Sequence, residues 1–234
     1  MKLGFVTCAD TTFMPGLEKL DKTILKHNNM TGIDKILISP NINEFRDYRI
    51  IRPDSKLINV PITNRRFKTA YYKLMLFSFS SYDRVVYIDS DVLCLGDISK
   101  LFDNDFELCA TKDDGINLNI MYYSHFRINS GVLSVGKKLL GIDVYDKMVQ
   151  IAMSGRSYDG GDQGVINEYI HQYNIPVTYL PMQYNTLKRI YFHHPEIWNK
   201  IKDDIRLLHF VGKDKPWCPG DSRYNELYKW WEQA

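Results

Sequence analysis

Apolar positions along the first half of the chain fall into two alternating patterns. In residues 16–26 and 69–79 apolar side chains recur three or four positions apart, which is the spacing of one helix face. Apolar runs of strand length occur between and around these segments, at residues 3–7, 35–38, 56–60 and 84–88. Strands that alternate with helices predict an α/β fold with a largely parallel central sheet flanked by helices.

The segment Arg84–Ile88 is apolar without a break from Val85 onward. Such a run predicts a strand at the centre of the sheet, covered on both faces. Ligands of parallel α/β sheets bind at the carboxyl ends of the strands. Polar residues follow two of these ends, after Thr7 and after Ile88, and we therefore expect the binding site there.

The second half of the chain is less regular. It holds a β-type run at residues 131–135, a predicted helix at 163–173 and an aromatic-rich tail. No repeat, low-complexity tract or Pro/Gly/Ser linker divides the sequence. We expect one domain over residues 1–234, in which the C-terminal half completes the site.

The composition limits which classes of binding partner the protein can have. The 234 residues are 44% hydrophobic and 25% charged, as in soluble globular proteins. Because 30 Lys and Arg face 28 Asp and Glu, there is no basic excess to hold a nucleic acid, although a local basic pocket could bind a small anion. No apolar stretch approaches the roughly 20 residues of a membrane span. The four cysteines are widely spaced without a C-x-x-C pair, which predicts free thiols and a cytoplasmic protein.

Asp89-Ser90-Asp91 is the sharpest local feature. In an extended segment residues i and i+2 point to the same side, so both carboxylates can converge on one cation. Mg²⁺ and Mn²⁺ are commonly shared between carboxylates and a substrate phosphate. The alternative is a solvated acidic turn, but the position directly after a buried strand favours the metal site.

Other enzyme classes fit this sequence less well. Phosphatases of the haloacid-dehalogenase type also place D-x-D after an apolar strand, but on the first strand and with Thr or Val two residues beyond the second Asp. Here that position is Leu93 and the strand is about the fourth. The signatures G-x-x-x-x-G-K-[ST] and G-x-G-x-x-G are absent, which argues against a P-loop enzyme and a dinucleotide dehydrogenase.

Two later stretches combine glycine with polar groups. Around Gly160-Gly161 the backbone could approach a ligand closely, and Asp162 stands at a predicted helix N-cap with Gln163 in the first turn. This stretch predicts either a capped helix or a binding loop. Near the end, His209 precedes Gly212 and two lysines that could meet a diphosphate. Taken alone, His209 could equally be a core histidine.

Together these segments resemble the glycogenin-like glycosyltransferases, glycosyltransferase family 8, which have the GT-A fold. The resemblance covers most of the chain, and its segments occur in the family's order. They are Phe5-Val6-Thr7, Tyr72-Lys73-Leu74, Val86 to Asp91, Asn129-Ser130-Gly131-Val132, Asp159 to Gly164, Tyr179-Leu180-Pro181 with Tyr184-Asn185, and His209 to Trp217.

The resemblance implies roles for individual residues. Asp89, Asp91 and His209 match ligands that hold Mn²⁺, with Mg²⁺ as the alternative, against the diphosphate of a UDP-sugar, and the imidazole favours Mn²⁺. Further donor contacts are implied for the uridine turn Thr7-Cys8-Ala9-Asp10, for Ser90 near the ribose, for Lys73 and Asn129, and for Gly212 and Lys215 in a diphosphate clasp. Arg65 or Arg66 matches the family's basic residue only approximately. Asp159, Asp162 and Gln163 match groups that line the reacting sugar.

The implied activity is metal-dependent, retaining transfer of a hexose from a UDP-sugar to a hydroxyl of a glycan or a protein-linked acceptor. Two alternatives remain open: a self-glycosylating primer, for which Tyr191 lies in roughly the right region, and a non-catalytic module that binds UDP-sugars. We also expect the segment from His209 to Trp217 to have little to pack against without ligand, and to close as a lid when UDP and metal bind.

Overall fold

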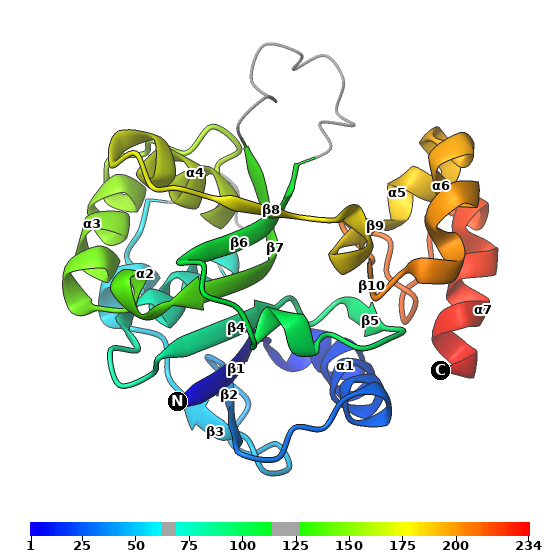
Figure 1. Ribbon diagram of the computed structural model, residues 1–234, viewed down its shortest axis with the longest axis horizontal. Coiled ribbons are helices and arrows are strands. Elements are labelled where there is room, and N and C mark those ends of the chain that lie inside the picture. Colours follow the sequence, from blue (N-terminus) through cyan, green and yellow to red (C-terminus); the bar gives the residue numbers. More distant parts are fainter. Residues whose placement is uncertain (62–68, 114–126) are drawn as a thin grey trace.

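A seven-stranded sheet runs through the centre of the computed structural model, which describes residues 1–61, 69–113 and 127–234 (Figure 1). Its strand order is β3-β2-β1-β4-β7-β6-β8. Among these described strands only β7 runs against its neighbours, so the expected largely parallel sheet is confirmed. The strands are β1 (Leu3–Cys8), β2 (Ile33–Ile38), β3 (Arg49–Ile51), β4 (Arg84–Ile88), β6 (Leu108–Lys112), β7 (Ile128–Gly136) and β8 (Thr178–Leu180).

Strand β4 has both faces covered, as its apolar run predicts. Val85 and Tyr87 belong to one hydrophobic cluster, whereas Val86 and Ile88 belong to another. Since neighbouring residues of a strand point to opposite faces, the two clusters lie on opposite sides of the sheet. The end of β4 is therefore fixed from both sides, and Asp89 follows it directly.

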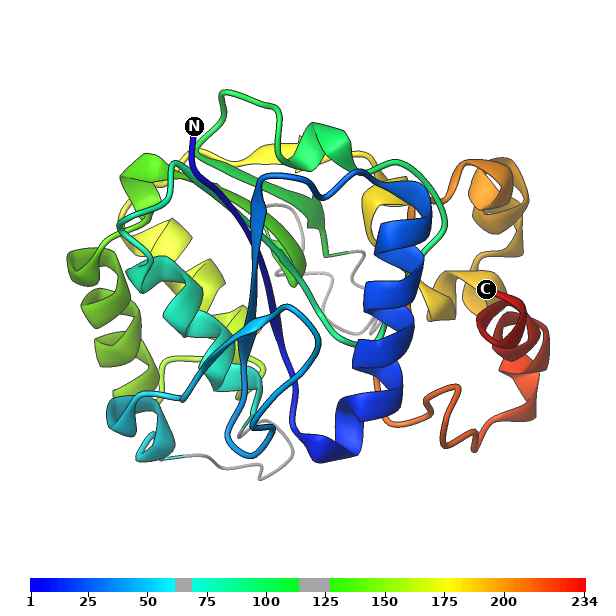
Figure 2. The ribbon, with the colours of Figure 1, turned by 90° about the horizontal axis from the view of Figure 1, so that it is seen from below.

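Helices supply the covering layers (Figure 2). Helix α1 packs its buried face on one side of the sheet, and α3, α4 and the 3₁₀ helix η3 cover the other side. The predicted helices at 16–26, 69–79 and 163–173 are confirmed, although the second has 3₁₀ geometry. These helices are α1 (Met14–His27), η3 (Ala70–Ser78), α3 (Ile142–Met153) and α4 (Asp162–Gln172).

The predicted strand at residues 56–60 was wrong. This region forms the short helix α2 (Ser55–Ile58), because the Asp54 side chain accepts a hydrogen bond from the Lys56 N–H and so caps a helical turn. The third parallel strand of the sheet is instead β3, which the hydrophobic pattern does not predict.

A second, three-stranded sheet carries the aromatic tail. Its order is β5-β10-β9, and helices α5, α6 and α7 pack beside it around buried aromatic residues (Figure 1). Its elements are β5 (Val92–Cys94), β9 (Thr186–Leu187), β10 (Leu207–His209), α5 (Lys188–His193), α6 (Pro195–Ile201) and α7 (Asn225–Gln233). The turn between β4 and β5 thus joins the two sheets.

All four cysteines are free thiols, as the sequence predicts. In the described ranges, none of the helices combines the length and apolar character that a bilayer crossing requires.

Candidate active site

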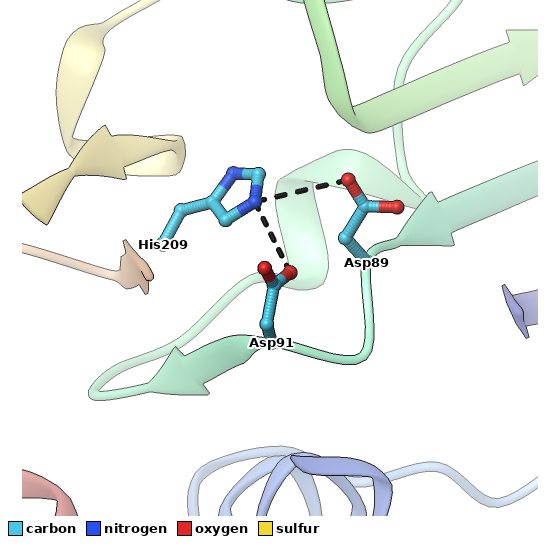
Figure 3. A group of neighbouring side chains, drawn as sticks. All are labelled: Asp89, Asp91 and His209. Atoms are coloured by element: carbon cyan, nitrogen blue, oxygen red, sulfur yellow. Dashed lines mark ion pairs between the residues drawn. The ribbon is translucent and has the colours of Figure 1, made fainter. Parts of the chain in front are cut away.

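The two carboxylates of Asp89 and Asp91 meet the imidazole of His209 (Figure 3). His209 is the last residue of β10, whose antiparallel pairing with β5 places it opposite Val92, next to Asp91. Its Nε2 atom lies 3.2 Å from Asp91 Oδ1 and 3.8 Å from Asp89 Oδ2. The three potential ligand atoms all lie within 4.8 Å of one another. Strand pairing therefore brings together the three residues that the family resemblance implies as metal ligands.

The two carboxylates differ in their electrostatic surroundings. Burial raises the pKa of Asp89 above its usual range, and the nearby Lys73 ammonium lowers it by less. Burial alone would also raise the pKa of Asp91, but Lys215 and His209 outweigh it and bring that pKa well below its usual range. Two carboxylate oxygens and one imidazole nitrogen are donors suited to Mn²⁺ or Mg²⁺, so the residues fit a divalent cation.

The buried Lys73 ammonium connects this cluster to the start of α4. Its Nζ atom lies 3.0 Å from Asp89 Oδ1 and 2.8 Å from Asp162 Oδ2, and it donates to the carbonyl and the hydroxyl of Ser130 at 3.2 Å. Burial lowers the pKa of Lys73, but the carboxylates of Asp162 and Asp89 outweigh that effect and the pKa is raised. Lys73 therefore stays charged and holds Asp162 beside the metal cluster.

Hydrogen bonds at the start of α4 hold Asp159 and Asp162, two of the residues predicted to line the sugar. Asp162 is the first helical residue and Gly161 the N-cap, so the predicted N-cap role of Asp162 was wrong. The capping contacts come instead from Asp159, whose Oδ1 accepts from the N–H groups of Gly161 and Gly164 at 2.9 and 3.0 Å. A Cβ at Gly164 would lie only 2.5 Å from this oxygen. Asp162 is thereby free to bond Lys73 and, at 2.7 Å, the Ser130 hydroxyl.

Hydrogen bonds fix the orientation of the Gln163 side-chain amide. Its Oε1 accepts from the Ser130 N–H at 3.2 Å, and its Nε2 donates to Asp113 Oδ2 and to the Tyr158 hydroxyl, each at 3.0 Å. The structure thus brings Asp162 and Gln163 together with Lys73 and the metal cluster.

The segment from His209 to Trp217 is packed. Lys215 donates to the Asp91 carboxylate and, at 2.7 Å, to the Phe210 carbonyl. The Trp217 ring packs against Phe13 and Trp231, with centroids 5.7 and 5.4 Å apart. The expectation that this segment has little to pack against was therefore wrong. Gly212 within it has φ +85°, a backbone conformation that favours glycine.

The residues predicted to bind uridine lie at the carboxyl end of β1, beside the end of β4. The pairing of Val6 with Tyr87 places the Thr7-to-Asp10 turn next to Asp89. Burial raises the pKa of the Cys8 thiol far above its usual value, so Cys8 is not a thiolate. Ser90 is buried in the turn between the metal ligands. Arg65, with Arg66, lies outside the described residues.

Three residues at the site are not among those predicted from the sequence. The Tyr87 hydroxyl donates to Asp89 Oδ1 at 2.6 Å, Ser130 holds both Asp162 and Gln163, and Asn185 connects His209 to Asn129. The sequence pattern indicates only an apolar strand position for Tyr87. Ser130 and Asn185 lie within segments that resemble the family, and this resemblance is the signal that points to them.

Known proteins resemble the chain in sequence. The profile of the family described as "Glycosyl transferase family 8" matches residues 6–219. Glycogenin of Komagataella phaffii is 31% identical over 220 residues, covering 79% of this chain and 50% of that protein. Mouse glycogenin-1 is 31% identical over 147 residues, covering 62% of this chain and 40% of that protein. The chain thus spans half or less of the length of these relatives.

Solved structures are similar over nearly the whole chain. An active-site mutant of LgtC superposes with a TM-score of 0.72 at 19% identity, covering 99% of this chain and 95% of that one. GlyE of Streptococcus pneumoniae has a TM-score of 0.69 at 19% identity, covering 100% of this chain and 61% of that one. These likenesses confirm the GT-A fold expected from the sequence.

Proposed function

Since this chain belongs to glycosyltransferase family 8, we propose that it transfers a hexose from a UDP-sugar to an acceptor hydroxyl, with a divalent metal and with retention of configuration. One observation carries the proposal. Two carboxylates and an imidazole from different sheets converge within 4.8 Å, and a buried lysine connects them to the two polar residues that begin α4.

Asp89, Asp91 and His209 are the residues that would hold the metal, Mn²⁺ in the first place and Mg²⁺ as the alternative. When bound, the metal supplies positive charge against the diphosphate that leaves. Lys215 adds a second positive charge beside Asp91, and the Gly212 backbone can approach a phosphate closely because it carries no side chain. These positive groups favour departure of UDP, because negative charge develops on its diphosphate in the transition state.

We propose that Asp162 and Gln163 face the reacting sugar. Asp162 is held by Lys73 and Ser130, and Gln163 by Ser130, Asp113 and Tyr158, so neither side chain has to reorganise during reaction. We propose that they stabilise positive charge on the sugar while the acceptor attacks from the face that UDP leaves. The departing phosphate then takes the acceptor's proton. Asp159 retains a predicted place beside the sugar, although its carboxylate also caps α4.

A cavity of about 220 Å³ adjoins the site. It is lined by Thr111, Tyr179, Met182, Asn185 and Leu187, among others, and Asn185 is bonded directly to the metal ligand His209. We propose that part of a glycan or glycoprotein acceptor occupies this cavity.

We further propose that residues 1–234 form one domain and that the protein is cytoplasmic.

A panel of UDP-sugars tests this function. Release of UDP should require one particular UDP-sugar and Mn²⁺, should stop with a chelator, and should rise when the right acceptor is added. Binding of UDP-sugars without release of UDP under any condition would instead identify a non-catalytic binding module.

The similarity to glycogenins favours a second candidate, self-glycosylation at Tyr191. The Tyr191 hydroxyl donates to Glu226 Oε2 at 2.7 Å, and its ring packs edge-on against Trp198. Intact-mass spectrometry after incubation with UDP-sugar and Mn²⁺ separates the two candidates. A mass gain of whole hexose units that disappears in Tyr191→Phe would establish the second.

A further inference from the structure

The side-chain amide of Asn185 lies behind the metal cluster, outside the three ligands. Asn185 is 2% exposed and immediately precedes β9. It makes three polar contacts: 2.9 Å to His209 Nδ1, 2.7 Å to Asn129 Oδ1 and 3.2 Å to Thr111 Oγ1. Every polar atom of this amide is therefore engaged.

A backbone N–H group determines which way the amide points. The Gly131 N–H lies 3.0 Å from the Asn129 side chain, and a backbone N–H can only donate, so the Asn129 atom there is the oxygen. That same oxygen faces Asn185, which must turn its NH₂ group toward it. The carbonyl oxygen of Asn185 then faces His209 Nδ1, and this nitrogen must carry a hydrogen.

The hydrogen on Nδ1 determines the state of the other ring nitrogen, Nε2. With hydrogen on Nδ1, the lone pair available for a metal is on Nε2, which is the atom that points at Asp91 and Asp89 (Figure 3). Gly131 supports the same ring position, because a Cβ there would lie 2.3 Å from His209 Cε1. The imidazole is thus held between the backbone of β7 and the Asn185 amide.

We propose that Asn185 is a positioning residue that sets the tautomer and orientation of His209 for metal binding. Because its NH₂ group also holds Asn129, the same amide ties the metal ligand to a residue predicted to contact the donor. The inference rests on the proposed function, since it takes Asp89, Asp91 and His209 as a metal site. Partners of metal-bound histidines typically contribute 10–100-fold in metal affinity.

Mn²⁺ titration followed by electron paramagnetic resonance tests the role without an activity assay. In Asn185→Ala, Mn²⁺ affinity in the presence of UDP should fall about 10–100-fold. Asn185→Asp keeps an oxygen for His209 Nδ1 but loses the donor to Asn129, so most of the Mn²⁺ affinity should remain while binding of the donor UDP-sugar, measured by calorimetry, weakens. The control is Asn28→Ala, which removes a similarly bonded amide at the end of α1 and should leave Mn²⁺ affinity unchanged.

Nuclear magnetic resonance of ¹⁵N-histidine-labelled protein reads the tautomer directly. With UDP and diamagnetic Mg²⁺, His209 should show a hydrogen on Nδ1 and none on Nε2, and the Nδ1–H signal should broaden or vanish in Asn185→Ala. A hydrogen on Nε2 instead would overturn the inference, as would equal Mn²⁺ affinity in the wild type and Asn185→Ala. If the wild type itself binds no Mn²⁺, the proposed function fails, whereas the Nδ1–H signal still decides the role of Asn185.

Discussion

Lys215 and Asp91 are 124 positions apart in sequence, yet the Lys215 ammonium bonds the Asp91 carboxylate. A proposed phosphate-binding cation and a proposed metal ligand therefore neutralise each other in the structure. When metal and diphosphate bind together, each takes one member of this pair, so the two ligands should bind cooperatively. This relationship underlies the first two predictions.

Asp91→Asn should abolish most activity. Loss of one ligand charge should cost several kcal/mol of transition-state stabilisation, on the order of a 10³-fold loss of rate. The carboxylate is buried and paired with Lys215, so the variant should also lose about 1–3 kcal/mol of unfolding free energy. Donor hydrolysis with Mn²⁺ and urea denaturation measure the two effects. Asp97→Asn, an exposed carboxylate that bonds Ser99, is the control. Near-normal hydrolysis in Asp91→Asn would remove Asp91 from the metal site.

Lys215→Ala should weaken UDP binding by about 1–3 kcal/mol, the range for a lost charge-assisted hydrogen bond. Calorimetric titration with Mn²⁺ present measures this loss, and Lys229→Ala, an exposed lysine of α7, should bind UDP normally.

Because the segment from His209 to Trp217 is already packed, the amides of Phe210 and Cys218, which donate to the backbone carbonyls of Asp91 and Lys215, should exchange slowly even without ligand. Fast exchange that slows only with UDP and Mn²⁺ would restore the idea of a lid.

Gln163→Ala should lower kcat while UDP affinity stays nearly unchanged. The side chain lies at the start of α4 with Asp162, and its proposed role is on the sugar rather than on the phosphates. Gln172→Ala, at the exposed end of the same helix, controls for effects on the helix itself. A large loss of UDP affinity in Gln163→Ala would place this side chain on the nucleotide.

Lys188 should make stability depend on pH. Burial first, and then repulsion from Lys215, lower the pKa of Lys188 to about 8, below the 10.5 of an unperturbed lysine. Between these values the unfolded chain binds more protons than the folded one, so this group's contribution to folding becomes more favourable as pH rises from about 8 toward 10. The free energy of unfolding of the wild type, measured relative to Lys188→Met, should increase across this window. A difference that stays flat from pH 7 to 10 would show that Lys188 is not perturbed.

Sequence patterns predicted the centre of the fold better than its periphery. Arg84–Ile88 is long and apolar enough to identify a central strand, which in turn located Asp89 and Asp91 at its end. The pairing that brings His209 to them involves strands of three residues, too short for periodicity to reveal. His209 could be placed only through the family resemblance.

Local hydrogen bonds explain the two wrong predictions of secondary structure and capping. The Asp54 cap outweighed the strand-like pattern of residues 56–60. At α4 the capping oxygen belongs to Asp159 rather than Asp162, because the turn at Gly160–Gly161 brings the earlier carboxylate to the free N–H groups. Spacing alone does not distinguish these two carboxylates.

The turn from Asp89 to Asp91 has a mechanical consequence. Asp89 follows a strand of the larger sheet and Asp91 precedes a strand of the smaller one, so a cation held by both would cross-link the two sheets. Helices α5 to α7 pack beside the smaller sheet, so the same cation would also tie them to the larger one.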